Sequence, residues 1–425
     1  MSAFDKIIGY DNIKEEMMQI CEMIRDEEKR YEKMGAKLPK GIMFYGEPGM
    51  GKSLMANCFV EESGLECFII RRNKGDGDFL KEMEDTFNKA KEKAPAVILL
   101  DDMDKFSNED YGKRDSEEYV AVQAGIDAVK DSKVFVVATV NDENKLPNSL
   151  IRAGRFDRKY SMNGLEGEDA VKLAKHFLKD VRLDENVVIE DVVKLVENNS
   201  SSTYETVINE AAIRAAYLKK EKISIEDLIY VTMAMNHKVK IDSHGKDISS
   251  AEKDQIEKMA IHEAGHVVIA ETIQPGSVAY AFVCINERAE GCTKAKKLKD
   301  EDKIIMDMAG KAAYEEKYAA NDRGCYNDTR MAIRRIASDM ISGMHGLDKV
   351  DVMDMIGERC TEQKRGVIEA EIRTQLEEYM LRARVILSAN RDFLEAVTKA
   401  LEEKQFLLYS EIQELRSKYE TKAAN

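Results

Sequence analysis

Two histidines four residues apart, with a glutamate directly after the first, are the clearest chemical signal in the sequence: His262, Glu263 and His266. In a helix this spacing brings both imidazoles onto one face, where their nitrogens can bind a single zinc ion. Glu263 would stand next to that ion, where a carboxylate can take a proton from water. The spacing therefore predicts a zinc site that carries out hydrolysis.

The residues around this motif predict a helix. Apolar side chains recur at three- and four-residue steps between Ile256 and Ile273, and the two histidines fall within that apolar stripe. Two buried histidines satisfied by hydrogen bonds are the alternative, but with only 6 histidines in 425 residues a chance pair at this spacing is rare. Gly265 costs a helix interior roughly 1 kcal/mol relative to alanine, which indicates that another segment approaches the backbone there.

A glycine-rich segment in the first part of the chain could cradle phosphate groups. A short apolar strand at 40–45 leads directly into it, and a helix is expected from Leu54 to Glu62. In this order of elements, backbone N–H groups and the helix N-terminus attract phosphate, Lys52 reaches the β- and γ-phosphates, and Ser53 binds magnesium. An ordinary glycine-rich turn would not require this order. The expected nucleotide contacts are Gly46, Glu47, Pro48, Gly49, Met50, Gly51, Lys52 and Ser53.

Acidic and amide side chains follow two further predicted strands. The strand at 96–100 ends at Asp101 and Asp102, and the strand at 134–140 ends at Asn141. Beside a phosphate loop, Asp101 would hold magnesium through water, and Asp102 would lie next to the water that attacks the γ-phosphate. Asn141 has a polar side chain suited to sense that phosphate. Together these segments predict a site that binds ATP with Mg2+ and hydrolyses it.

With Asn141, the segment Arg152-Ala-Gly-Arg155-Phe-Asp-Arg resembles the AAA+ ATPase family. Taken alone, two arginines three residues apart are more often solvated surface charges. The resemblance implies that Arg152 and Arg155 reach the γ-phosphate bound by the next subunit of a ring, where they neutralise charge in the transition state. It also implies an α/β fold with a doubly wound parallel sheet. The adenine contacts that it implies are Ile8 and Gly9.

Residues 159–235 show no strand pattern and resemble the helical lid that closes over nucleotide in AAA+ proteins. Helices are expected there at 170–178, 189–197, 204–219 and 225–234. A polar stretch with His237, His244 and Gly245 then predicts a linker. The expected organisation is an AAA+ large ATPase subdomain at 1–158, a helical lid at 159–235, a linker at 236–252 and a mostly α-helical zinc metallopeptidase domain at 253–425.

An ATPase of this kind, followed in one chain by the histidine motif, resembles the FtsH-type ATP-dependent zinc metalloproteases. The resemblance runs from Phe4 almost to the C-terminus and implies a third zinc ligand, Asp328, in an Asn-Asp pair that opens a helix. From the residues alone, Asp328 could instead be the cap of that helix. The resemblance also implies that Gly291-Cys292-Thr293 lies on an edge strand that holds extended substrate by backbone pairing.

The sequence departs from the family pattern at four places. The transmembrane helices with which the family begins are not found, so membrane anchorage is not expected. Asp102 stands where the family has glutamate, and a carboxylate that falls short by roughly 1 Å can slow a reaction on the order of 100-fold. No aromatic grip on the translocated chain is evident around Arg71–Phe79, unless Phe79 itself has that role. The Gly-Gly…Ala-Ala-Glu stretch of the family is Ala309-Gly310-Lys311-Ala312-Ala313-Tyr314 here.

Composition limits the remaining possibilities. A net charge of −15 with no broad basic stripe argues against general nucleic-acid binding. The 7 cysteines are scattered singly and odd in number, which favours free thiols in a reducing compartment. The N-terminus lacks a signal pattern, and the longest apolar runs are too short to span a bilayer. We therefore expect a cytoplasmic protein without a membrane span.

The function expected from these motifs and resemblances is that of an ATP-dependent zinc metalloendopeptidase. The family implies a homo-oligomeric ring, a hexamer, that unfolds or threads polypeptides and hydrolyses them. The expected substrates are unfolded or loosely folded polypeptides, and the expected cofactors are Zn2+ and ATP with Mg2+. Asp102 and the missing grip leave open a nucleotide-gated peptidase or regulatory scaffold with a slow ATPase. A remodelling chaperone with a vestigial zinc motif is a third possibility.

Overall fold

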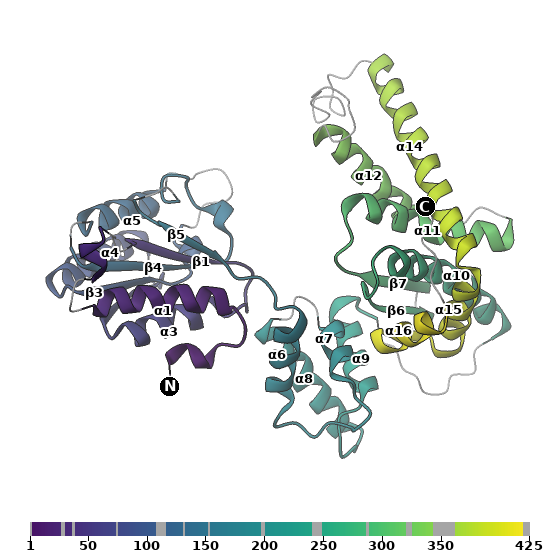
Figure 1. The fold of residues 1–425 in the computed structure, drawn as a ribbon, viewed down its shortest axis with the longest axis horizontal. Helices are drawn as coiled ribbons and strands as arrows, with labels where there is room; N and C mark the ends of the chain where they lie inside the picture. The colour runs from purple at the N-terminus through teal and green to yellow at the C-terminus, as the bar shows by residue number, and fades with distance from the viewer. Residues whose placement is uncertain are drawn as a thin grey trace. The chain divides into compact units, whose positions relative to one another are not determined.

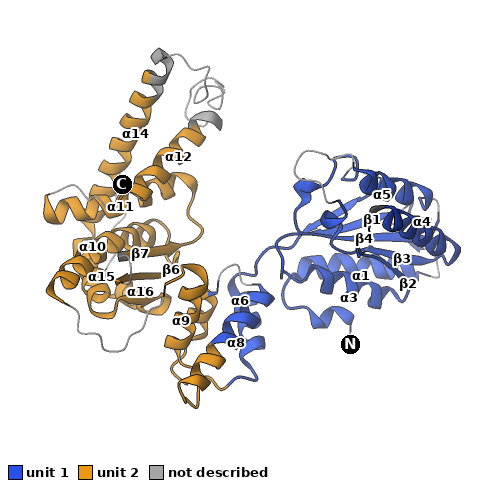
Figure 2. Cartoon of the chain, turned by 180° about the vertical axis from the view of Figure 1, so that it is seen from behind, with its two compact units in different colours: residues 1–181, 196–210 blue, residues 182–195, 211–425 orange. Residues whose placement is uncertain are grey.

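The computed structural model of this chain divides it into two compact units (Figure 2). The first comprises Met1–Val181 with Val196–Glu210, and the second comprises Arg182–Leu195 with Ala211–Asn425. Arg152 lies outside the residues that the structure describes, as do His244 and Gly245 of the predicted linker. The described residues are 2–26, 30–35, 39–73, 75–107, 116–130, 132–151, 154–196, 200–239, 249–285, 289–319, 325–342 and 362–419.

A parallel sheet forms the centre of the first unit (Figure 1). Its strands are β1 (Gly41–Tyr45), β2 (Glu66–Ile70), β3 (Ala96–Leu100), β4 (Val134–Val140) and β5 (Arg158–Ser161). The order β2-β3-β4-β1-β5 and the parallel pairing of every neighbour bring all the carboxyl ends to one edge. The strands predicted at 40–45, 96–100 and 134–140 are confirmed.

Helices cover both faces of this sheet, because its central strands are apolar on both sides. Ile42 of β1 packs with Met17 and Phe59 on one face, whereas the adjacent Met43 packs with Phe87 and Val122 on the other. Alternate side chains of one strand thus serve two cores, which confirms the doubly wound α/β fold. The covering helices are α1 (Asp11–Arg25) and α3 (Lys52–Ser63) on the first face and α4 (Asp76–Glu92) and α5 (Glu117–Ala128) on the second (Figure 1).

Short helices complete this unit. They are η1 (Ala3–Lys6), α2 (Arg30–Lys33), η2 (Met103–Lys105) and η3 (Glu143–Lys145).

Four helices follow β5 at the positions predicted for the lid: α6 (Gly167–Leu178), α7 (Ile189–Leu195), α8 (Ser201–Tyr217) and α9 (Ile225–Asn236). The boundary between the two units falls within this region, with α6 in the first unit and α7 and α9 in the second. The expectation of no strand in residues 159–235 is wrong for the first three of them, because β5 extends to Ser161. Only Tyr160 of β5 is buried, so this short edge strand has no apolar pattern to detect. The predicted four-part division stays a prediction.

The second unit packs helices around a small antiparallel sheet. Its helices are α10 (Ser250–Ile273), α11 (Asp300–Tyr318), α12 (Tyr326–Ser342), α14 (Glu362–Ala389), α15 (Arg391–Lys404) and α16 (Tyr409–Lys418). Its strands are β6 (Val278–Ile285), β7 (Ala289–Ala295) and β8 (Phe406–Leu408), in the order β7-β6-β8. Among the described strands β7 pairs with β6 alone, so the segment Gly291–Thr293 lies on an edge strand, as predicted.

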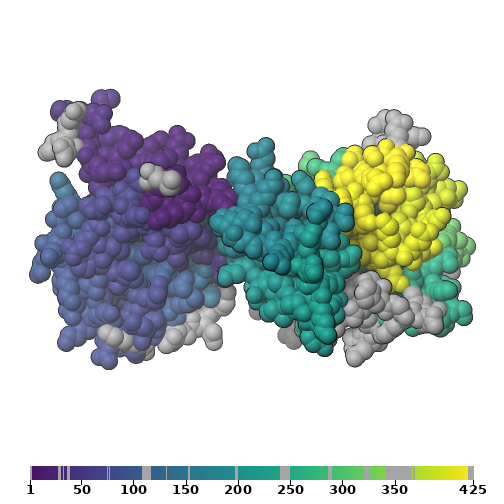
Figure 3. Space-filling view, turned by 90° about the horizontal axis from the view of Figure 1, so that it is seen from below, coloured from purple at the N-terminus to yellow at the C-terminus, as the bar shows by residue number. Residues whose placement is uncertain are grey.

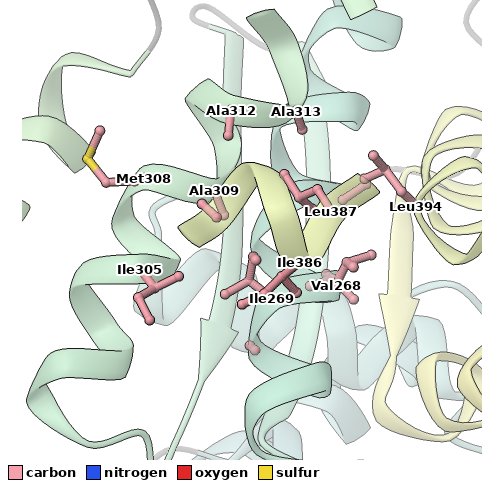
Figure 4. Packing of buried hydrophobic residues seen from close by; sticks show 14 of the residues in the cluster. Val268, Ile269, Ile305, Met308, Ala309, Ala312, Ala313, Ile386, Leu387 and Leu394 are labelled. Carbon is pink, nitrogen blue, oxygen red and sulfur yellow. The ribbon is translucent and has the colours of Figure 1, made fainter. Parts of the chain in front are cut away.

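Apolar side chains from α10, α11 and α14 form the core of this unit (Figure 4). Val268 and Ile269 of α10, Ile305 of α11 and Leu387 of α14 are all buried there. Burial of each such side chain is worth about 1.5–3 kcal/mol. The small side chain of Ala309 lets the backbones of α10 and α11 come close. This core therefore fixes how α10, which carries the two histidines, lies against α11.

Helix α7 of the predicted lid contacts the C-terminal helix within the second unit. The Asp191 carboxylate accepts hydrogen bonds from the backbone N–H and the hydroxyl of Ser410, at 2.8 and 2.7 Å. Asp191 thereby caps the first turn of α16, whose N–H groups lack partners within the helix. In Figure 3 the C-terminal residues, in yellow, lie directly against teal residues of the lid region.

Two observations bear on the expected environment. Within the described ranges, no helix combines the length and the apolar composition needed to cross a lipid bilayer. The cysteines that the structure describes form no disulfide with one another: Cys21, Cys58, Cys67, Cys284, Cys292 and Cys325.

Candidate functional site

Three side chains meet where the histidine motif predicts a metal centre. His262 and His266 lie on α10, and Asp328 lies in the first turn of α12. Their ligand atoms are all within 4.8 Å of one another. His262 Nε2 is 3.0 Å from Asp328 Oδ2 and 3.1 Å from His266 Nε2. The structure thus brings together the two histidines given by spacing and the aspartate implied by the resemblance.

A backbone carbonyl fixes the orientation of the second imidazole. The Nδ1–H of His266 donates to the carbonyl oxygen of Met306, on α11, at 2.7 Å. In the neutral imidazole that a metal requires, this leaves the lone pair on Nε2, the atom that lies 3.7 Å from Asp328 Oδ2. A second partner of this kind sets the tautomer and the ring orientation of an imidazole that binds metal.

The Asp328 carboxyl is held in its ionised form. Burial alone would raise the pKa of Asp328, but the hydrogen bond with His262 and the interaction with His266 outweigh burial and lower the pKa below its usual range. Helix α12 is tied to α11 by Arg335, whose Nε lies 3.0 Å from Asp307 Oδ2. An anionic oxygen therefore stands beside the two imidazole nitrogens.

Glu263, the candidate proton carrier, is held between α10 and the edge strand β7. Its side chain is buried, and its Oε2 accepts a hydrogen bond from the Thr293 hydroxyl at 2.7 Å. Gly291 on the same strand faces the other oxygen, since a β-carbon there would lie 2.6 Å from Oε1. The carboxylate thus fills the space that a side chain at position 291 would need.

Glycines also allow α10 and α11 to approach. A β-carbon at Gly265 would lie 2.6 Å from the carbonyl oxygen of Ala309, so the prediction that another segment meets the backbone there is confirmed. That segment is α11. Gly310, the next residue of α11, makes room for the first imidazole: a β-carbon there would lie 2.5 Å from Nε2 of His262.

This cluster fits zinc by its donor chemistry. Two imidazole nitrogens and one carboxylate oxygen are a ligand set found in catalytic zinc sites, which keep a further position open for water. The hydrogen bond to the Met306 carbonyl orients the His266 ring, and the space at Gly310 accommodates the His262 ring. The residues that could hold the ion are His262, His266 and Asp328.

The glycine-rich loop at 46–51 joins β1 to α3, in the order of elements that the sequence predicts. Lys52, the first residue of α3, donates to the backbone carbonyls of Gly46 and Glu47, each at 2.7 Å. Burial lowers the pKa of Lys52, and the negative charges of Asp102 and Asp104 oppose that shift. The lysine thus lies within the loop and close to the acidic strand ends.

Asp101 is the centre of a hydrogen-bond cluster at the carboxyl edge of the sheet. Its Oδ1 accepts from the hydroxyls of Ser53 at 3.1 Å and Thr139 at 2.8 Å, and its Oδ2 accepts from the Arg71 guanidinium. Burial alone would raise the pKa of Asp101, but the hydrogen bonds from Arg71, Thr139 and Ser53 lower it. The two residues predicted to hold magnesium, Ser53 and Asp101, are therefore adjacent and the carboxylate is ionised.

Asp102 and Asn141 are in contact at the same edge. The Asn141 amide donates to Asp102 Oδ1 at 3.3 Å, and Lys105 Nζ lies 2.7 Å from Asp102 Oδ2. The structure thus joins the two residues predicted to act at the γ-phosphate. Lys105, which the sequence did not indicate, also binds the Asp102 carboxylate, so this carboxylate has Asn141 on one oxygen and a cation on the other.

Arg155 is engaged within its own chain. Its guanidinium donates to Asp127 Oδ2 at 2.9 Å, to the Ser149 carbonyl at 2.5 Å and to Gln123 Oε1 at 3.2 Å. A role at a neighbouring subunit's phosphate would require this side chain to leave these acceptors. Its predicted companion Arg152 lies outside the described residues.

The implied adenine segment lies beside the start of α6. Ile8 is half-buried, and a β-carbon at Gly9 would lie 2.6 Å from a methyl carbon of Leu165. The lid region also contacts the phosphate loop, because the N–H of Ser201, at the start of α8, donates to the carbonyl of Gly49 at 3.2 Å. The residues expected to surround a nucleotide are therefore gathered in the first unit.

Phe79 does not supply the missing substrate grip. Its side chain is 0% exposed and packs edge to face against Phe106, with 5.1 Å between ring centroids. The suggestion that Phe79 takes this role is wrong, because a fully buried ring cannot contact a passing chain.

Sequence reasoning missed Gly310, Met306 and Arg71 as parts of the two sites. A glycine inside a predicted helix was a usable signal for Gly310, as it was for Gly265. No side-chain pattern can reveal Met306, since its backbone carbonyl makes the contact. Arg71 directly follows a strand whose end lies beside Asp101, so correct pairing of that strand would have found it.

Comparisons with known proteins give two kinds of match. Residues 42–163 match the family of ATPases associated with various cellular activities (AAA). Over 95% of its length the chain is 27% identical to the ATP-dependent zinc metalloprotease FtsH of Rhodothermus marinus and covers 62% of that protein. Over 97% of its length it is 27% identical to FtsH of Leptotrichia buccalis, covering 56% of it, and 28% identical to FtsH 3 of Symbiobacterium thermophilum, covering 71%. These matches confirm the resemblance indicated by the motifs.

Proposed function

We propose that this chain, a divergent relative of the FtsH-type AAA+ zinc metalloproteases, is an ATP-dependent zinc metalloendopeptidase. The observation that carries the proposal is the meeting of His262, His266 and Asp328 in one cluster, directly beside Glu263. Zinc, when bound by these three residues, would polarise a water molecule and the carbonyl of the peptide bond to be cut. The same chain carries the phosphate loop of an AAA domain.

Glu263 moves the proton in the proposed reaction. As a general base it takes a proton from water while the water attacks the peptide carbonyl, and as a general acid it gives that proton to the leaving amine. The hydrogen bond from Thr293 to Oε2 fixes the carboxylate and so sets the direction of Oε1. The absence of a side chain at Gly291 leaves space for this arrangement.

The edge strand β7 orients the substrate. An extended polypeptide can pair with the outer edge of β7, since backbone groups there are not taken by a further described strand. Pairing at this edge brings the substrate backbone close to Glu263, because Gly291 and Thr293 of β7 both face that carboxylate. Backbone pairing is tolerant of side chains, which suits unfolded or loosely folded polypeptides as substrates.

ATP hydrolysis drives delivery of the chain to this site. Ile8 and Gly9 contact adenine, Lys52 contacts the β- and γ-phosphates, and Ser53 with Asp101 holds Mg2+. Asp102 and Asn141 position the attacking water. Arg152 and Arg155 act on the γ-phosphate of the next subunit, which makes a homo-oligomeric ring, a hexamer, the active form. The described cysteines form no disulfide with one another, which favours a reducing compartment such as the cytoplasm.

The second candidate is a nucleotide-gated peptidase with a slow ATPase and weak unfolding activity. The contact between Lys105 and the short carboxylate of Asp102 favours it, as does the burial of Phe79. The two candidates differ in what ATP achieves. A motor degrades a tightly folded substrate and an unstructured peptide with comparable ATP stimulation, whereas a gate cleaves the peptide alone.

The test of the first proposal is the exchange of Glu263 for glutamine. Glu263→Gln should abolish casein cleavage while zinc content and ATP turnover stay near those of the wild type. Asp254→Asn is the matched control, since it makes the same chemical change on an exposed side chain of the same helix. Cleavage that persists in Glu263→Gln, or that resists a chelator in the wild type, would reject the assignment.

A further inference from the structure

Strand pairing places an arginine next to the proposed magnesium residue. β2 and β3 pair in parallel with Ile70 opposite Leu100, so the residues that follow, Arg71 and Asp101, leave the sheet side by side. The N–H of Asp101 also donates to the carbonyl of Ile70 at 3.0 Å, which keeps the two strand ends together. The neighbourhood of Arg71 and Asp101 is therefore a property of the sheet and not of a loose surface contact.

Arg71 binds the Asp101 oxygen that other donors leave available. The hydroxyls of Ser53 and Thr139 both donate to Oδ1, whereas Nε and a terminal nitrogen of Arg71 both donate to Oδ2, with Nε at 3.1 Å. The Arg71 side chain is 65% exposed and that of Asp101 only 7%. The guanidinium thus reaches from solvent onto a buried carboxylate, in the two-donor geometry typical of strong arginine–carboxylate pairs.

The adjacent arginine has a different task. Arg72 forms an ion pair with Glu118 at 3.0 Å, and both side chains are nearly buried. Its guanidinium also lies 5.7 Å from the centre of the Phe79 ring. Arg72 therefore ties the end of β2 to α4 and α5. Of the two arginines, only Arg71 is directed to the phosphate site.

We propose that Arg71 competes with Mg2+ for Asp101 and supplies positive charge beside the nucleotide phosphates when Mg2+ is scarce. The inference rests on the proposed nucleotide site. Mg2+ needs an anionic carboxylate, and a guanidinium bound to Oδ2 weakens the negative charge that Asp101 offers to an ion beside Ser53 at Oδ1. Because the Arg71 side chain is largely exposed, its guanidinium can turn a donor from Asp101 to phosphate, which guanidinium groups bind well. Arg71 therefore makes nucleotide binding less dependent on Mg2+ and raises the Mg2+ concentration that the site requires.

The experiment measures nucleotide affinity as a function of free Mg2+. The full chain is titrated with a fluorescent, non-hydrolysable ATP analogue, first in excess EDTA and then at increasing free Mg2+. The variants are Arg71→Met, which keeps most of the side-chain volume without the charge, and Arg71→Lys, which keeps the charge without the paired donors. Arg25→Met is the matched control, because Arg25 forms an exposed ion pair with Glu62 on the same unit.

In EDTA, Arg71→Met should bind the analogue about fivefold more weakly than the wild type, and its Mg2+ midpoint should be about fivefold lower, the upper end of the range for ion pairs open to solvent. Arg71→Lys should have an affinity in EDTA and a Mg2+ midpoint between those of the wild type and Arg71→Met. Arg25→Met should match the wild type in both quantities. An unchanged Mg2+ midpoint in Arg71→Met overturns the proposal. If the wild type binds the analogue and Lys52→Ala does not, the proposed nucleotide site stands, and an unchanged midpoint in Arg71→Met then overturns only the role given to Arg71. If the wild type binds no analogue at any Mg2+ concentration, the proposed nucleotide site fails as well.

Discussion

Replacing Gly310 with alanine should weaken zinc binding, although alanine is the better helix former. Within a helix the exchange by itself is favourable by about 1 kcal/mol. The new β-carbon, however, would lie 2.5 Å from Nε2 and Cε1 of His262. Atoms in contact lie about 3.5 Å apart, so the ring or α11 must move by about 1 Å. Zinc–ligand distances tolerate about 0.2 Å, and we therefore expect zinc affinity to fall about 10- to 100-fold.

The assay is a titration of the zinc-loaded protein with a chelator, read together with thermal unfolding. Gly366→Ala is the matched control, because Gly366 also lies in a helix, α14, and a β-carbon there meets nothing within 4 Å. The control should hold zinc like the wild type and unfold at the same or a slightly higher temperature. Gly310→Ala should lose zinc at a lower chelator concentration. Wild-type zinc affinity in Gly310→Ala would refute the claim that this glycine sets the position of the His262 ring.

Three other side chains, Thr293, Asp102 and Asp227, can be tested in the same way. Thr293→Val should lower kcat for peptide cleavage about 10- to 100-fold at unchanged zinc affinity, because a hydrogen bond to a charged group is worth about 1.5–3 kcal/mol. Thr293→Ser should retain most activity, and equal kcat in the wild type and both variants would exclude support from β7. Asp102→Glu should raise ATP turnover, measured as phosphate release, if carboxylate reach limits the rate; equal or slower turnover would show that reach is not limiting. Burial alone would raise the pKa of Asp227, but its hydrogen bonds, above all the one from Lys220, lower this pKa. The ionised Asp227 therefore contributes its full stabilisation of the fold above the ordinary pKa of about 3.9, and this stabilisation is lost as the pH falls through the lowered pKa. Asp227→Asn should therefore lower the unfolding free energy by about 3 kcal/mol at neutral pH. In denaturant titrations this difference between wild type and variant should shrink below about pH 4, and a difference that stays constant down to about pH 3 would contradict an origin in the ionised Asp227.

The parts of the fold that the sequence predicts are those encoded by neighbouring residues. The apolar run at 96–100 needs no partner to be identified as a strand, and β3 has those bounds. The spacing of His262 and His266 likewise encodes a shared helix face before any tertiary contact is known. Asp328 is different, since its local sequence also fits a helix cap. Only the resemblance to a family selected it as a ligand, and the structure then placed it 3.0 Å from His262.

The parts that the sequence does not predict depend on pairs of segments far apart in the chain. The space at Gly310 matters only because α11 packs on α10, and the charge of Arg71 matters only because β2 pairs with β3. β5 was missed for another reason: of its four residues only Tyr160 is buried, so strand and loop look alike in its sequence. Phe79 was misjudged because an aromatic residue in a largely charged segment can be either exposed or central to a core.

The most direct test of the central claim is the zinc content of the purified chain. Metal analysis should give about one zinc per chain in the wild type, because a three-ligand site holds a single ion. His262→Ala and Asp328→Ala should each lose most of that zinc while remaining folded. A wild-type chain that retains no divalent ion at His262, His266 and Asp328 would contradict the account.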